Sequence, residues 1–88
     1  MATFAQRLQR AQRSGNLTVA DLARWFDRPY PTVRCWINGA SPGGGPIDQE
    51  AVLSALQLLE VRIRTKQGFP LGRMSPKERV AKIMKMRP

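Results

Sequence analysis

The sequence predicts a small all-α protein, a bundle of about five helices with a long fourth helix and a basic C-terminal helix. Apolar residues recur three and four positions apart in five separate segments, which is the spacing of one helix face. Residues that cap or break helices separate these segments. The 88 residues, of which 42% are hydrophobic, suffice for one small core. We expect two regions in this bundle. The first is residues 1–46, and the second, residues 47–88, serves packing and oligomerisation.

The first helix is predicted from its cap and its apolar face. Thr3 is a suitable N-cap for a helix in which Phe4, Leu8 and Ala11 share one side. The segment Ser14-Gly15-Asn16 then ends the helix.

A second helix is expected after Thr18, because Asp21 follows three residues later in a pattern close to a capping box. The segment Asp27-Arg28-Pro29 ends it, since the residue before a proline avoids the helical conformation. We expect Trp25 at a packing edge, partly exposed. The inward-facing residues of this helix are Leu22, Ala23 and Phe26.

A third helix is expected to start near Pro31, because a proline in the first turn loses no hydrogen bond. Gly39 stops this helix. Its apolar side consists of Val33, Trp36 and Ile37, so the opposite side faces outwards.

A glycine-rich loop, residues 41–46, precedes the long fourth helix at about 48–66. No Gly-Lys-Ser/Thr follows the glycines, so the loop lacks a nucleotide-binding motif. Leu58 and Val61 lie beside the main apolar stripe, and we expect them to contact a partner chain. The main stripe consists of Val52, Ala55, Leu56, Leu59 and Ile63.

The last helix is expected from Ser75 as N-cap, with Pro76 in its first turn and Glu78 as a capping-box residue. Its apolar face is expected to dock on its own domain or on a partner, which leaves the lysines outside. That apolar face consists of Val80, Ile83 and Met84.

The residue inventory excludes several classes of function. The chain has no histidine and one cysteine, so a Cys/His zinc site, a His-based triad and an intramolecular disulfide are impossible. No nucleophile–base pair is evident, and we expect no enzymatic activity, metal, cofactor or small-molecule substrate. No apolar run approaches the ~18 residues of a membrane-spanning helix, and residues 1–12 have no hydrophobic signal segment. The expected location is the cytoplasm.

The chain is strongly basic, with 15 Lys and Arg, 6 Asp and Glu and a formal net charge of +9. The excess is spread over both regions. A surface of this charge attracts polyanions over a Debye length of about 10 Å. The alternative is a charge that serves solubility alone, but no predicted element has acidic residues that balance it. A nucleic acid is therefore the expected partner.

The first 45 or so residues resemble the helix-turn-helix DNA-binding family typified by the phage Cro and repressor proteins, so residues 1–46 are the expected DNA-binding region. In that family a small residue at the position of Ala23 lets two helices cross closely, and a glycine at the position of Gly39 ends the recognition helix. The segment is also similar to excisionase-like and MerR-like helix-turn-helix proteins. The matching positions are Leu17, Thr18, Leu22, Ala23, Val33, Trp36 and Gly39. The expected motif core consists of Leu22, Ala23, Phe26, Val33, Trp36 and Gly39.

Three positions depart from the pattern of the family. Asp27 stands where a turn glycine is usual, and Arg28 stands where an apolar residue is usual. Pro31 is unusual inside a recognition helix. Because Asp tolerates a left-handed backbone better than most residues, we still expect the turn to form.

If Val33 and Trp36 face the core, the outward N-terminal end of the third helix enters the major groove of DNA. Two roles are open for Arg34, a bidentate contact with guanine or a contact with a phosphate. The base-reading candidates are Tyr30, Pro31, Thr32, Arg34 and Cys35, of which Cys35 is alternatively a surface filler. The phosphate candidates are Thr18, Arg24, Arg28, Lys77, Lys82 and Lys85, for which N-capping and solvation are the alternative roles.

The sequence thus predicts a sequence-specific protein for double-stranded DNA, of the phage or prophage transcriptional regulator type. A homodimer would occupy an operator with two recognition helices about 34 Å apart. One alternative is a DNA-packaging subunit similar to the phage small terminase, in which the long helix builds a ring. Another is an antitoxin-like interaction protein. Oligomer size separates the regulator, a dimer, from the packaging subunit, a ring of about eight or more. A second polypeptide that co-purifies would indicate the antitoxin-like protein.

Overall fold

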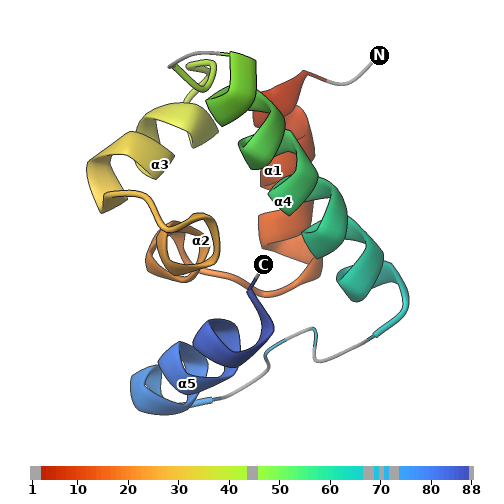
Figure 1. The fold of residues 1–88 in the computed structure, drawn as a ribbon. Coiled ribbons are helices and arrows are strands. Elements are labelled where there is room, and N and C mark those ends of the chain that lie inside the picture. The colour runs from red at the N-terminus through yellow and green to blue at the C-terminus, as the bar shows by residue number, and fades with distance from the viewer. Residues whose placement is uncertain (1–2, 44–45, 67–68, 70, 72–73, 88) are drawn as a thin grey trace.

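The computed structural model describes residues 3–43, 46–66, 69, 71 and 74–87, and these residues form five α-helices and no strand (Figure 1). The predicted all-α bundle with a long fourth helix is therefore confirmed. Glycines 44 and 45 of the predicted loop lie outside the described residues. In chain order the helices are α1 (Phe4–Ser14), α2 (Val19–Phe26), α3 (Tyr30–Ile37), α4 (Pro46–Arg64) and α5 (Pro76–Met86).

Side-chain caps determine where the helices begin. The Thr18 hydroxyl accepts a hydrogen bond from the Asp21 N–H at 3.1 Å, and the Asp21 carboxylate accepts one from the Thr18 N–H at 2.9 Å. Thr3 and Gln6 form the same reciprocal pair at the start of α1. Ser75 caps α5 through its hydroxyl, which accepts from the Glu78 N–H at 3.3 Å. The Glu78 side chain makes no return bond to the Ser75 N–H, so the capping box expected at this helix is wrong. Because the first N–H groups of a helix have no partner within it, these bonds stabilise each start, and the three predicted caps are confirmed.

The turn between α2 and α3 depends on Asp27. This residue has φ 54° and ψ 52°, the left-handed conformation expected from its side chain. Its N–H donates to the Arg24 carbonyl, and the Arg28 N–H donates to the Ala23 carbonyl at 3.0 Å. These bonds end α2, and α3 begins at Tyr30 with a proline in its first turn.

One hydrophobic core joins both regions of the chain. The rings of Phe4 and Phe26 lie 5.6 and 5.7 Å from the ring of Trp36, each edge-on. Phe69 and Leu71, which lie between α4 and α5, are also buried, although no helical pattern marks them. Fully buried side chains include Leu8, Leu22, Val33, Leu56, Leu59 and Ile83.

Trp25 lies in this core, so the expectation of partial exposure is wrong. Its side chain is 2% exposed, and its Nε1–H donates to the Ala55 carbonyl of α4 at 2.9 Å. Its ring also meets the ring of Phe69 edge-on. The periodicity of α2 alone does not reveal that α4 covers this side of the helix.

An ion pair joins α1 to α4. The Arg7 guanidinium donates to the Glu60 carboxylate at 2.6 and 3.2 Å. These hydrogen bonds raise the pKa of Arg7 above its ordinary value, against the opposing effect of burial. The long helix is thus tied to the first three helices at two points, by Trp25 near its middle and by this pair further along.

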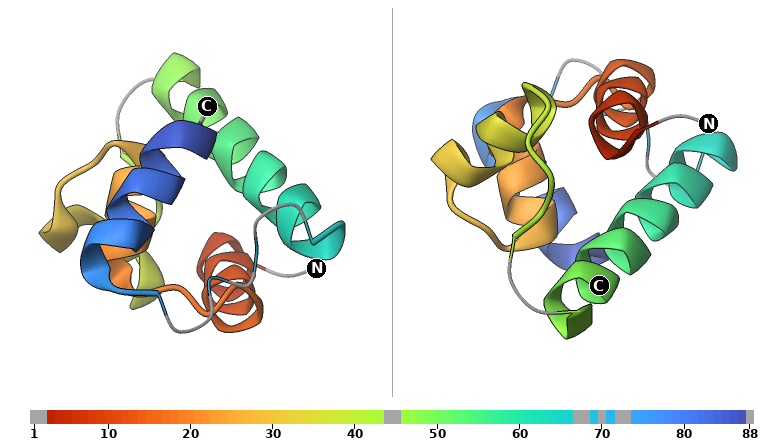
Figure 2. Two further views of the ribbon diagram at one scale, coloured as in Figure 1. Left: turned by 90° about the horizontal axis from the view of Figure 1, so that it is seen from below. Right: turned by 90° about the horizontal axis from the view of Figure 1, so that it is seen from above.

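α5 packs against α2 of its own domain, so that α2 lies between α3 and α5 (Figures 1 and 2). Ile83 is buried, but Met84 is 47% exposed, so the expected docking face is wrong at that position. Met74 and Met86 pack against the core instead. Met86 follows Ile83 by three residues and shares its face, whereas adjacent residues such as Met84 point about 100° away.

Candidate nucleic-acid interface

α2, the Asp27 turn and α3 form a helix-turn-helix unit whose inner side is closed. Val33 and Trp36 are buried on α3, and Leu22, Ala23 and Phe26 are buried on α2. The small side chain of Ala23 allows the two helices to pack closely. This burial fixes the rotation of α3, and therefore which of its side chains face solvent.

The other side of α3 faces solvent. Tyr30 is 48% exposed, Pro31, Arg34 and Cys35 are exposed, and Thr32 is half-buried. The five base-reading candidates therefore lie together on one face or at its margin. Gly39 is also exposed, with a φ of 115° and no neighbour where a side chain would project. The glycine thus serves the backbone conformation at the end of α3 rather than core packing.

A groove opens where the N-terminal ends of α2, α3 and α5 meet. We call it the N-terminal groove, and its volume is about 430 Å³. Tyr30, the first residue of the candidate recognition helix, and Pro76, the first residue of α5, both line this groove. The sequence gives no sign of this, because the two residues belong to helices far apart in the chain. The lining residues are Thr18, Val19, Ala20, Asp21, Arg24, Tyr30, Pro76 and Arg79.

Asp21 is the buried charge of this groove, with 1% of its surface exposed. Besides the Thr18 N–H, its carboxylate accepts a hydrogen bond from the Arg79 guanidinium at 2.7 Å. The Arg24 guanidinium lies 3.8 Å from its other oxygen. Arg79 also donates to the carbonyl of Asn16 at 3.1 Å. Arg79 thereby ties α5 to the first turn of α2, an interaction that no pattern in the sequence indicates.

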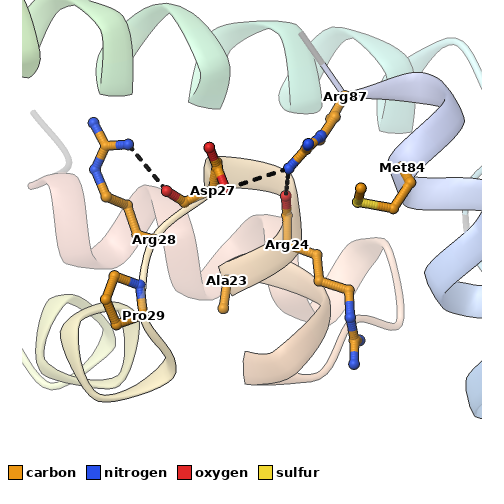
Figure 3. Close-up of a pocket in the computed structure, with 7 residues that line it drawn as sticks. All are labelled: Ala23, Arg24, Asp27, Arg28, Pro29, Met84 and Arg87. Carbon is orange, nitrogen blue, oxygen red and sulfur yellow. Dashed lines mark hydrogen bonds and ion pairs between the residues drawn. The ribbon is translucent and has the colours of Figure 1, made fainter.

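A second groove of about 500 Å³, which we call the arginine groove, lies at the other end of α2 (Figure 3). The Arg28 guanidinium donates to the carbonyls of Phe26 and Asp27 at 3.3 and 3.1 Å. Arg87 lies 3.5 Å from the Asp27 carboxylate and donates to the Arg24 carbonyl. Of the phosphate candidates, Arg24 and Arg28 therefore border this groove. The lining residues are Ala23, Arg24, Asp27, Arg28, Pro29, Met84 and Arg87.

The remaining candidates lie on α5 and α4. Lys77 and Lys85 are exposed, and Lys82 is half-buried. Leu58 and Val61, the expected contacts with a partner chain, are both half-buried, and Leu58 packs against the core of its own chain. The most exposed large apolar residues of α4 are Ile47 at 83% and Leu53 at 44%.

The described residues contain no group of three His, Cys, Asp or Glu side chains placed to hold a metal ion. Nor is any helix within these ranges both long and apolar enough to cross a membrane. Comparison of the chain with models of protein families, with curated proteins and with solved structures finds no match.

Proposed function

We propose that this chain binds double-stranded DNA in a sequence-specific manner, with α3 as the recognition helix, and acts as a phage or prophage-type transcriptional regulator. The supporting observation is the closed inner side of the helix-turn-helix unit. Because Val33 and Trp36 are buried, Tyr30, Pro31 and Arg34 stand outside, on the side of α3 that could enter the major groove.

The charge of the chain supports the same partner. A net charge of +9 on 88 residues favours a polyanion. Arg24 borders the N-terminal groove, and Lys77, which follows the groove-lining Pro76 in the chain, is exposed. In this proposal Arg34 contacts base edges, and the basic residues around it contact phosphates, which set position and orientation.

Regulation would be steric. A homodimer would place two copies of α3 in successive major grooves, about 34 Å apart, and so block access to the operator. The mass of the protein in solution tests this: a dimer supports the regulator, whereas a ring of about eight or more copies would support a packaging subunit.

The decisive test of the recognition helix is Arg34→Ala. If Arg34 contacts a guanine, the variant should lose about 1–3 kcal/mol on the preferred duplex and much less on a scrambled one. The preferred duplex is first selected from a random pool, and affinities are then measured by fluorescence anisotropy. Arg10→Ala is the matched control, because it removes the same charge from an exposed position on α1. Equal losses on both duplexes would make Arg34 a phosphate contact, and no loss on either would refute the assignment of α3.

A further inference from the structure

The first turn of α2 presents an electrostatic problem for any DNA-binding role of this unit. Thr18 and the N–H groups that follow it border the N-terminal groove, close to Tyr30. Asp21, whose carboxylate caps the helix, lines the same groove and is 1% exposed. A carboxylate at this position repels a phosphate, because two like charges would approach each other at a partly dry surface.

Arg79, which belongs to another helix, counteracts this repulsion. Its guanidinium donates to the Asp21 carboxylate at 2.7 Å, and its side chain is 16% exposed. Together with Arg24 at 3.8 Å from the same carboxylate, it changes the formal charge of the cluster from −1 to +1. The neutralising group comes from α5, 58 positions away from Asp21 in the sequence.

We propose that Arg79 is a positioning residue for DNA binding: by neutralising Asp21, it makes the N-terminal groove attractive to the duplex backbone, so that only a chain with α5 docked on α2 binds DNA well. This inference depends on the proposed function, and it assigns a role to α5 beyond the general basic charge of its lysines. Arg79 need not touch DNA itself, because most of its surface is covered.

Arg87 provides a matched comparison at the C-terminal end of the same helix. It too is an arginine that pairs with an aspartate of the helix-turn-helix unit, Asp27, at 3.5 Å. The Asp27 side chain, however, is 83% exposed, so water screens its charge without help from Arg87. Arg79→Met and Arg87→Met therefore remove the same net charge, but only Arg79→Met takes the 2.7 Å partner from a buried carboxylate, which then keeps Arg24 at 3.8 Å as its ion-pair partner.

The experiment measures the affinity of full-length variants for one preferred and one scrambled duplex over a range of salt concentrations. Arg79→Met should bind both duplexes about tenfold or more weakly than Arg87→Met. The double variant Asp21→Asn/Arg79→Met should return to within about twofold of Arg87→Met, because no charge remains to be neutralised. Asp21→Asn alone should bind at least as tightly as the parent chain. Circular dichroism melts establish the temperature at which every variant is folded.

Three results would overturn the inference. Equal affinities of Arg79→Met and Arg87→Met would mean that Arg79 contributes net charge alone. A double variant no better than Arg79→Met would mean that the ion pair serves folding only. Weaker binding by Asp21→Asn would contradict the repulsion itself, and this variant keeps the inference testable even if Arg79→Met does not fold. If the parent chain binds no duplex, the proposed function fails as well, whereas these three results leave it intact.

Discussion

At the scale of single residues, the two tryptophans show how burial arises in a small core. Trp36 lies on the predicted inner side of α3 and contacts Phe4 and Phe26 edge-on. Trp25 is equally buried, yet its burial depends on α4, whose Ala55 carbonyl accepts the indole N–H. The first could be predicted from helical spacing, whereas the second required knowledge of which helix covers α2.

Trp36→Ala should lower the free energy of unfolding by about 3–5 kcal/mol, because a large buried aromatic is replaced by a cavity. Such a loss is a large part of the roughly 5–15 kcal/mol that stabilises a typical domain. Urea denaturation followed by circular dichroism measures the change. Tyr30→Ala is the control, since removal of a side chain that is 48% exposed should lower the free energy of unfolding much less. An unchanged midpoint for Trp36→Ala would mean that α3 is rotated and that Arg34 faces inwards.

At the scale of elements, the helices are set by caps and turns, and the turn at Asp27 connects α2 to α3. A non-glycine residue here adopts φ 54° between two eight-residue helices. Asp27 also receives an ion pair from Arg87, although its side chain remains mostly exposed. The backbone conformation, rather than the charge, is therefore what this position demands.

Substitutions at position 27 separate these two contributions. Asp27→Val should lower stability by about 1–2 kcal/mol, because a β-branched residue tolerates the left-handed region poorly. The stability of Asp27→Gly should equal or slightly exceed that of the parent chain, since glycine adopts this conformation without steric cost. Asp27→Asn should stay within about 0.5 kcal/mol of the parent, because an exposed ion pair contributes little. Thermal melts of the three variants decide, and a valine variant as stable as the glycine variant would contradict the left-handed turn.

At the scale of the whole molecule, α5 is docked on α2 of the helix-turn-helix unit rather than being a separate tail. Ile83 is 1% exposed, and Arg79 covers the first turn of α2. Deleting residues 75–88 would therefore disturb the fold as well as remove charge. A test of α5 as a DNA-binding element has to keep the helix docked.

The double variant Lys77→Gln/Lys85→Gln meets this condition, because both lysines are exposed. If both bind phosphates, it should weaken binding to every duplex alike and reduce the slope of log affinity against log salt by roughly 0.9 for each phosphate that is no longer neutralised. The preference for one sequence should survive, since α3 is unchanged. An unchanged salt slope would show that these lysines face away from the duplex.

Much of the local structure was predictable, because its causes act within a few residues. The caps at Thr3, Thr18 and Ser75 follow from side chains that reach the next turn of the same helix. The left-handed turn follows from Asp27, and the inner side of α3 from the spacing of Val33 and Trp36. These features determine the all-α class and the outward face of the candidate recognition helix.

Only the tertiary structure decided how α4 and α5 join this unit. The burial of Trp25 and Leu71, the exposure of Met84, and the hydrogen bond from Arg79 to Asp21 each depend on a second segment far away in the chain. Helical spacing specifies the direction of a side chain about its own axis but not which helix it meets. The sequence therefore determined the helices and their apolar faces, and packing decided that the charge at the start of α2 is balanced from α5.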